Sequence, residues 1–172
     1  RPDQAERLEE EGIATFLHVP TPALLKIFLK QGAKRFIFEG RECGGHVGPL
    51  SSFVLWTRMV DTLLEFAEDP SSIQVLFAGG IHNSLSAAMA TTIATPLLSK
   101  GMSWGILIGT PYLFTREAVN DGAITETFQK QAIQCSETVC LPVAPGHANR
   151  CLPSQFSEDF LALRRNLIRE EA

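Results

Sequence analysis

Four short apolar runs alternate with helix-like segments along much of the chain, and this alternation constrains the fold more than any other feature. The runs are IATFLHV (13–19), KRFIFEG (34–40), IQVLFAGG (73–80) and SWGILIGT (103–110). Continuous apolar runs of this length, separated by segments with helical spacing, predict the strands of a parallel sheet that helices cover on both faces. The runs end near glycine or polar residues, at the end of the strand where such folds place their ligands.

Helices are predicted between and around these strands. The expected helical segments are 2–11 with Pro2 in its first turn, 22–31 capped by Thr21, 51–69 with an apolar stripe, a small-residue helix that begins near Asn83 or Ser84, 123–136, and 157–171. The segment between the last two helices is rich in proline, glycine and cysteine, and we expect it to be a loop.

The number of strands favours half of a barrel. A closed parallel barrel needs eight strands, commonly in about 250 residues, whereas this chain of 172 residues offers four runs. The sequence therefore predicts an α/β fold, the C-terminal half of a TIM barrel, with a helical C-terminal tail. We expect a single domain over 1–172, with core βα units at 13–118 and a helical extension at 119–172. Because the chain begins with Arg1, we also expect it to be a segment of something longer.

The composition argues against some partners. The net charge of -4 and the pI near 5.6 leave no basic surface for nucleic acid. No apolar run approaches the roughly 20 residues that span a bilayer. The cysteines lack the paired C-x-x-C spacing of a zinc site; they are Cys43, Cys135, Cys140 and Cys151. We therefore expect reduced thiols, no metal, no membrane contact and a cytoplasmic protein.

Two neighbouring runs end in turns that suit a phosphate group. Gly79 and Gly80 stand between the third run and the helix that follows, and Gly109 with Thr110 ends the fourth run. Backbone N–H groups in such turns, together with a helix dipole, can hold a phosphate. Barrels commonly place a phosphate site after their last two strands. The alternative is that these glycines only form tight turns, but the adjacent pair favours the phosphate.

A single histidine stands in the glycine-rich stretch FIFEGRECGGHVG (36–48), which contains the second run and the residues after it. His46 is expected to lie on a loop with Gly44, Gly45 and Gly48, which permit tight turns or the close approach of a ligand. Neutral imidazole accepts a proton near pH 7, so His46 is a candidate base. The alternative is a histidine that only hydrogen-bonds the loop backbone.

Other polar side chains near the strand ends are weaker candidates. His18 can point toward the same edge of the sheet, although packing is its simpler role, and His82 is expected only to help start a helix. Glu39 and Glu42 flank the turn and are candidates to orient His46 or to bond backbone N–H groups. Solvent exposure is the alternative for Glu42.

Two further features lie on predicted loops. Cys43 adjoins two glycines, and we interpret it as a small buried side chain rather than a reactive thiol. The segment PGHANRC (145–151) carries His147 and Arg150. Arg150 can pair with a phosphate or a carboxylate, although a surface contact is the simpler interpretation.

Three segments resemble one enzyme family. EGRECGGHVG (39–48) resembles the E-G-x-E-A-G-G-H-x-G signature of the nitronate monooxygenase (2-nitropropane dioxygenase) family, which the flavin-dependent enoyl-acyl carrier protein reductases share. FAGGI (77–81) and LIGTPYLFTREA (107–118) resemble the A-G-G-I and G-T-R-F-x-x-T-x-E-A segments of the same family, in the same order. The resemblance implies a TIM barrel that binds FMN, with the four runs as strands five to eight.

The resemblance also implies roles for residues. His46 falls on the catalytic histidine of the family. The implied cofactor-binding residues are those of the matched turns: Gly44, Gly45, Gly79, Gly80, Gly109 and Thr110. Two positions depart from the family, because Cys43 replaces an alanine and Pro111 stands where arginine is common. A longer connection at 81–109 is similar to barrel domains embedded in polyketide or polyunsaturated fatty acid synthases.

Three functions stay open on this basis. The first is a nitronate monooxygenase that oxidises nitronates or nitroalkanes with FMN, with His46 as base. The second is an enoyl-acyl carrier protein reductase domain, in which NAD(P)H reduces FMN and the hydride then passes to an acyl chain that is attached to a carrier protein. The third is an inactive barrel half that serves as scaffold. In each, the N-terminal half of the barrel is expected in the parent chain, and we expect this chain alone to bind FMN weakly or not at all.

Overall fold

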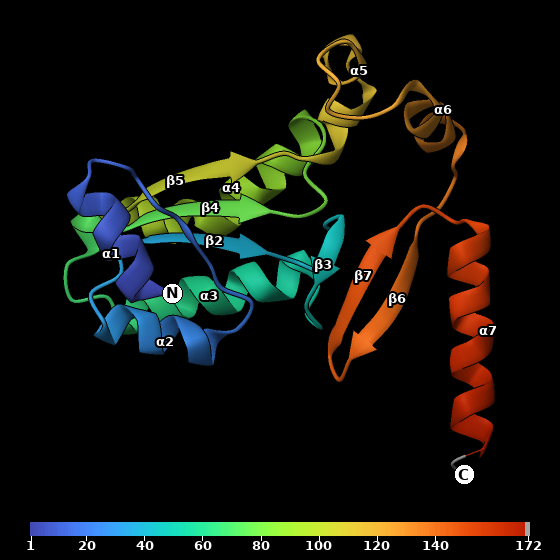
Figure 1. Cartoon of the computed structure of the whole chain (residues 1–172). Coiled ribbons are helices and arrows are strands. Elements are labelled where there is room, and N and C mark those ends of the chain that lie inside the picture. Colours follow the sequence, from blue (N-terminus) through green and yellow to red (C-terminus); the bar gives the residue numbers. More distant parts are fainter. Residues whose placement is uncertain (171–172) are drawn as a thin grey trace. The chain divides into compact units, whose positions relative to one another are not determined.

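A computed structural model describes residues 1–170, which form two compact units (Figure 1). Unit 1 comprises Arg1–Glu42 and Leu50–Ile108, and unit 2 comprises Cys43–Pro49 and the chain from Gly109 onward. Residues 171 and 172 lie outside the described part. The expectation of a single domain stays a prediction, because two compact units can belong to one domain of a longer protein.

Unit 1 is built on a parallel sheet of four strands in the order β1-β2-β4-β5. The strands are β1 (Leu17–His18), β2 (Arg35–Glu39), β4 (Gln74–Ala78) and β5 (Ser103–Leu107) (Figure 1). All four predicted strands are confirmed. Pairing along β1 stops after Val19, whose N–H donates to Ile37 at 3.0 Å, because Pro20 has no N–H group to donate to the sheet. The described strands form an open sheet and not a closed barrel.

The helices of unit 1 agree with the predicted segments. They are α1 (Pro2–Glu10), α2 (Pro22–Lys30), α3 (Ser52–Phe66) and α4 (Ser84–Ser99), with a 3-10 turn η1 (Pro70–Ser72) before β4. The predicted cap of α2 is confirmed, since the Thr21 hydroxyl accepts the N–H of Leu24 at 3.3 Å. Asn83 caps α4 in the same way, by accepting the N–H of Ser86 at 2.9 Å.

One face of the sheet carries the core of unit 1. Phe36 lies beside Val75 in register, Phe38 lies beside Phe77, and all four side chains are buried. The indole of Trp56, on α3, stacks on Phe77 with ring centroids 5.1 Å apart. Its Nε1–H donates to the carbonyl of Phe38 at 3.0 Å. Helices α2 and α4 contact α3 on either side, so the three helices form one layer over this face.

The opposite face of the sheet is more open. Side chains alternate between the two faces of a strand, and Ile37 and Leu76 on this second face are only half-buried, while Leu107 is exposed. The prediction that helices cover both faces is therefore wrong for the described residues. In a barrel-type sheet the inner face is filled by the side chains of the strands themselves, so no helix layer forms there.

Unit 2 contains a second sheet that the sequence did not predict. The strands are β3 (Gly45–Val47), β6 (Val139–Ala144) and β7 (His147–Cys151), antiparallel and in the order β3-β7-β6. Its helices are α5 (Arg116–Asn120), α6 (Glu126–Gln134) and α7 (Gln155–Glu170), after a 3-10 turn η2 (Thr110–Phe114). The predicted helices at 123–136 and 157–171 are confirmed as α6 and α7, except that residue 171 is not described.

The loop predicted between these two helices is wrong, because β6 and β7 form a hairpin there, so the C-terminal tail is not only helical. Gly146 takes a positive φ of 74° in the turn between these strands, a conformation that glycine adopts without strain. The partner of β7 on its other side is β3, far away in sequence. The hairpin resembled a loop because Pro142 lies within β6 and Pro145–Gly146 forms the turn, and these residue types argue against a strand.

Among residues 1–170, no helix has both the length and the apolar character that a membrane crossing requires.

Candidate functional site

The carboxyl edge of the parallel sheet carries the first group of candidate residues. β2 ends at Glu39 and β4 ends at Ala78, and these two residues are partners in register. Gly79 and Gly80 follow β4 directly and lead toward α4, as predicted. In parallel α/β folds this edge is the one where ligands bind.

The Gly79–Gly80 turn has the features of an anion cradle. Gly79 has a φ of 113° and Gly80 a φ of 74°, a region that favours glycine. Within the described residues, neither N–H group donates a hydrogen bond to the chain. Two adjacent N–H groups without an internal acceptor can bind an anion.

The first turn of α4 is satisfied within the chain. Asn83 Oδ1 accepts the N–H of Ser86, and Ser86 Oγ accepts the N–H groups of His82 and Asn83 at 3.0 and 3.1 Å. His82 thus helps to start the helix, as expected, and its ring Nδ1 lies 2.9 Å from the carbonyl oxygen of Gly80. An anion bound at this edge would therefore contact the N–H groups of Gly79 and Gly80 rather than the N–H of Ser86, which is already bonded to Asn83.

Glu42 is a structural carboxylate next to this turn. Its Oε2 accepts the N–H and the hydroxyl of Ser52 at 2.6 and 2.5 Å, at the start of α3. A Cβ on Gly80 would lie 3.3 Å from Glu42 Cβ, so the two segments are in close contact. The predicted role in bonding backbone N–H groups is confirmed, and Glu42 is at the same time an exposed residue, as the alternative interpretation expected. The charge of the carboxylate is offset by the positive end of the helix dipole.

The same edge holds a histidine–carboxylate pair. His18 Nε2 lies 2.9 Å from Glu39 Oε2, with side chains that are 44% and 29% exposed. The simple packing role expected for His18 is therefore wrong: the ring meets a carboxylate at the strand ends. Sequence spacing gave no signal for this pair, because the two residues lie on neighbouring strands that only the sheet brings together.

His46 lies in unit 2, on strand β3 and not on a loop as expected. β3 begins at Gly45, whose φ of 74° is a conformation that favours glycine. A Cβ added to Gly44 or to Gly45 would have no other atom within 4 Å. The imidazole is exposed, and its Nε2 lies 3.1 Å from Nδ1 of His147 on β7. The possibility that His46 only bonds loop backbone receives no support, since its recorded partner is a side chain.

The remaining candidates also belong to unit 2. Gly109 precedes η2 and Thr110 is its first residue, and both are exposed. Gly109 has open space around an added Cβ. Cys43 is 8% exposed, which agrees with its interpretation as a small buried side chain. Arg150 donates to the hydroxyl of Thr138 at 2.6 Å, across the β6–β7 hairpin.

The predicted site residues thus fall into two groups. Gly79 and Gly80 lie together in unit 1, and the others lie in unit 2: Gly44, Gly45, His46, Gly109 and Thr110. The roles assigned to all of them stay predictions. Among the described residues, no three histidine, cysteine, aspartate or glutamate side chains gather closely enough to hold a metal ion.

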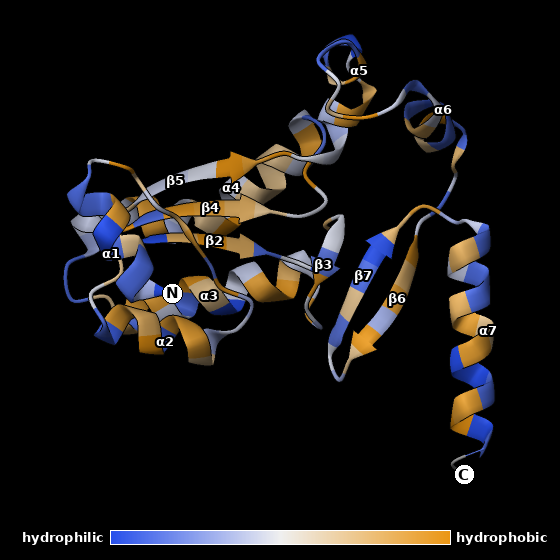
Figure 2. Ribbon diagram, viewed as in Figure 1, coloured by the Kyte–Doolittle hydropathy of each residue, from blue (hydrophilic) through white to orange (hydrophobic). Residues whose placement is uncertain are grey.

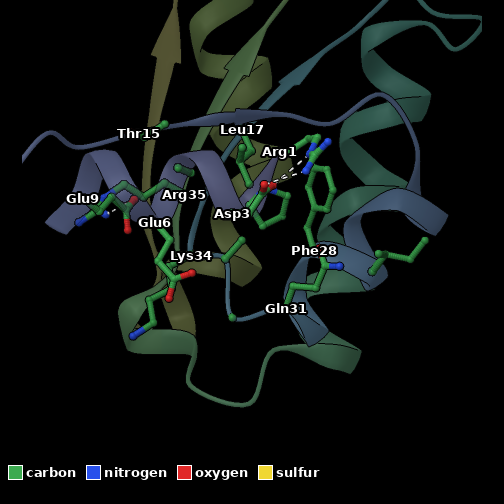
Figure 3. A pocket seen from close by; sticks show the side chains of 15 residues that line it. Arg1, Asp3, Glu6, Glu9, Thr15, Leu17, Phe28, Gln31, Lys34 and Arg35 are labelled. Carbon is green, nitrogen blue, oxygen red and sulfur yellow. Dashed lines mark hydrogen bonds and ion pairs between the residues drawn. The ribbon is translucent and has the colours of Figure 1, made fainter.

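A hollow of about 850 Å³ lies at the other end of the strands (Figure 3). It is lined by residues of α1 and α2 and by the amino end of β2, such as Glu9, Phe28 and Arg35. Its charged groups are largely matched with one another: Arg35 donates to Glu9 at 2.6 Å, and Arg1 pairs with Asp3 at 2.7 Å. Because it lies at the amino ends of the strands, this hollow is not the candidate active site.

Comparison with curated proteins finds weak relatives. The chain is 25% identical over 130 residues to "(3aS,4S,5R,7aS)-5-hydroxy-7a-methyl-1-oxo-octahydro-1H-indene-4-carboxyl-CoA dehydrogenase" of Rhodococcus jostii. The aligned segment covers 74% of this chain and 32% of that relative. It is 24% identical over 159 residues to "Putative monooxygenase Rv1533" of Mycobacterium tuberculosis. That aligned segment covers 92% of this chain and 38% of the relative. The chain thus spans only about a third of the length of these relatives. No known family model matches it.

Comparison with solved structures identifies the fold. FabK from Thermotoga maritima superposes with a TM-score of 0.70 at 22% identity, covering 92% of this chain and 45% of FabK. The M276A mutant of the same protein superposes with a TM-score of 0.68 at 21% identity, covering 94% of this chain and 47% of the mutant. FabK is a TIM-barrel protein, so the described chain has the fold of about half a barrel. Its assignment to strands five to eight stays a prediction.

Proposed function

We propose that this chain is part of an FMN-dependent oxidoreductase. The observation that carries the proposal is the Gly79–Gly80 turn, whose two N–H groups have no acceptor within the described chain, at the carboxyl edge of a sheet that has the FabK fold. FabK is a flavin-dependent enoyl reductase. The three sequence segments that resemble the nitronate monooxygenase family support the same cofactor.

The residues at the turn fit a phosphate group. The N–H groups of Gly79 and Gly80 would hold the phosphate of FMN, and the adjacent Glu42 carboxylate is already bonded to Ser52. For Gly109 and Thr110, which belong to unit 2, a phosphate-binding role is proposed from the family resemblance alone. Gly44 and Gly45 carry no side chain and would leave space for the flavin ring. Bound FMN would supply the two-electron redox chemistry of the reaction.

His46 is proposed as the base of the first candidate reaction, nitronate or nitroalkane oxidation. Its imidazole is exposed, and Nδ1 has no recorded hydrogen bond within the described residues. A neutral imidazole with an available nitrogen can remove a proton from the carbon next to a nitro group. The monooxygenase named among the relatives supports this reaction.

A second reaction is supported by other relatives. FabK and the CoA dehydrogenase both point to an acyl thioester, which favours an enoyl-acyl carrier protein reductase with NAD(P)H as electron donor. In that reaction His46 in its protonated form would donate a proton to the acyl chain. An inactive scaffold is the remaining alternative.

The experiment that separates these functions uses the whole protein that contains this chain. We expect the purified protein to carry FMN. Under anaerobic conditions, bleaching by a nitronate would support the first reaction. Bleaching by NAD(P)H, followed by reoxidation with an enoyl thioester, would support the second. A protein that neither carries nor takes up FMN would refute the proposal, and the inactive scaffold would then be the remaining function.

Two substitutions test the residues. Gly80→Ala should lower the FMN content, because it strains the turn and crowds Glu42. Gly32→Ala is the matched control, since Gly32 has a similar φ of 80° with no neighbour within 4 Å. His46→Ala should lower turnover roughly 100-fold or more while FMN content stays near normal. Unchanged turnover would contradict the role of His46 as base.

A further inference from the structure

His46 has a partner that the proposed function does not use. Its Nε2 lies 3.1 Å from Nδ1 of His147, a normal hydrogen-bond distance, and the ring centroids are 5.1 Å apart at an interplanar angle of 32°. Both residues belong to unit 2, and they are 101 positions apart in sequence. The contact gives a role to the PGHANRC segment, which the sequence alone left unexplained.

The second sheet creates this contact. His46 on β3 lies opposite Asn149 on β7, and His147 is two positions before Asn149 on the same strand. Side chains two positions apart on a strand share a face, so His46 and His147 are diagonal neighbours across an antiparallel pair. The turn at Gly146 makes His147 the first residue of β7, and this sets the position of the His147 ring along the strand.

The chemistry of two neutral imidazoles restricts how the pair can be protonated. Each neutral ring has one N–H donor and one acceptor nitrogen, so either His46 donates from Nε2 or His147 donates from Nδ1. If His147 donates, Nε2 of His46 is occupied as an acceptor and its Nδ1 carries the proton. The ring then has no available lone pair for a substrate. If His46 donates, its Nδ1 keeps the lone pair and has no recorded partner within the described residues.

We propose that His147 is a positioning residue for His46: its Nδ1 accepts the Nε2–H of His46, which leaves Nδ1 of His46 as the atom that exchanges a proton with the substrate. This inference rests on the proposed role of His46 as base. When a substrate C–H bond breaks, its proton forms the Nδ1–H bond of His46 and its electron pair stays on the substrate. The resulting imidazolium keeps its Nε2–H bond to His147, which then becomes charge-assisted and stronger.

The tautomer of His46 can be measured directly, without turnover. In the whole protein with ¹⁵N-labelled histidine side chains, long-range ¹H–¹⁵N spectra distinguish protonated from unprotonated ring nitrogens. We expect His46 to carry its proton on Nε2, and His147→Ala to shift it toward a mixture of tautomers. Asn149→Ala, on the same strand and face, should leave the His46 proton on Nε2. A His46 ring protonated on Nδ1, or one that His147→Ala does not alter, would overturn the proposal.

Kinetics give an independent readout. His147→Ala should lower kcat roughly 10- to 100-fold, the range expected when a charge-assisted hydrogen bond is lost, with KM nearly unchanged. His147→Asn places an amide near the position of Nδ1 and should restore most of kcat, which a merely structural role would not predict. Equal losses in the alanine and asparagine variants would overturn the positioning role.

The two proposals fail in different ways. If His46→Ala leaves turnover intact, the proposed base is wrong, and the spectra still show whether the histidine pair exists. If His46→Ala abolishes turnover but His147→Ala changes neither kcat nor the His46 signals, only the positioning role is refuted.

Discussion

Unit 1 and unit 2 are stabilised to different degrees by apolar packing. Unit 1 buries several large side chains completely, among them Phe36, Phe38, Phe77, Leu25, Met59 and Leu63. Unit 2 has a smaller buried set, whose apolar members are Cys43, Val47, Leu141 and Ala148. Because buried apolar area is the main favourable term in folding, unit 1 should tolerate little change in its core, whereas unit 2 depends more on strand pairing and polar contacts.

Hydropathy along the chain shows the same difference. In Figure 2, β2 and β4 are largely hydrophobic, whereas α7 alternates between hydrophobic and hydrophilic segments. Phe156, Leu163 and Leu167 on α7 are 70%, 61% and 51% exposed in the described chain. Unit 2 therefore has apolar side chains that contribute little to its stability.

The largest expected effect comes from the aromatic core of unit 1. Phe38→Ala removes a ring that is fully buried, and it should lower the free energy of unfolding by about 3–5 kcal/mol. Leu141→Ala, in the small core of unit 2, should cost about 2 kcal/mol. Both tryptophans, Trp56 and Trp104, lie in unit 1, so urea unfolding followed by fluorescence reports on that unit.

One result would contradict the difference in stability between the two units. If Leu141→Ala moves the fluorescence midpoint as far as Phe38→Ala does, the two units unfold together and do not differ in stability. We expect instead that the Leu141→Ala midpoint stays close to that of the unchanged chain, while circular dichroism detects earlier loss of structure.

A second prediction concerns the junction between β2 and α3. An added Cβ on Gly40 would lie 2.1–2.5 Å from atoms of Ser52, including its backbone, so the helix would have to move. Gly40→Ala should therefore cost about 3 kcal/mol, the upper range for overpacking. Gly44→Ala is the matched control, because no atom lies within 4 Å of its added Cβ. Equal stability of the two variants in urea would refute the close approach of Gly40 and Ser52.

A smaller effect is expected for the carboxylate at the start of α3. Glu42→Gln keeps an acceptor for Ser52 but removes the charge that the helix N-terminus favours, and it should cost about 1 kcal/mol. Glu65→Gln, near the other end of the same helix, should have no such cost. A loss of stability in both variants would indicate a general effect of net charge rather than of helix position.

The parallel sheet could be predicted from sequence because each of its strands is a continuous apolar run, and the glycines of the Gly79–Gly80 turn mark its carboxyl edge. The second sheet could not, because β3 and β7 are short and pair across a large sequence separation. For the same reason the contacts His46–His147 and His18–Glu39 had no sequence signal. Periodicity predicts local structure, whereas contacts between distant segments depend on packing.

The smallest predicted effect concerns a half-buried thiol of unit 2 and tests how far the fold shields it from water. Burial raises the pKa of the Cys151 thiol, and neighbouring Cys140 adds to the rise. Below the ordinary thiol value of about 8.5 both folded and unfolded chains keep this proton, so its contribution to stability is constant. As the pH rises further, the unfolded chain loses the proton first, and the free energy of unfolding should fall until the folded thiol also ionises. Cys151→Ser should remove this part of the decline between about pH 8 and 10, measured by urea unfolding at each pH, and Cys135→Ser should retain it. An identical decline in both variants would mean that Cys151 is as well hydrated in the fold as in the unfolded chain.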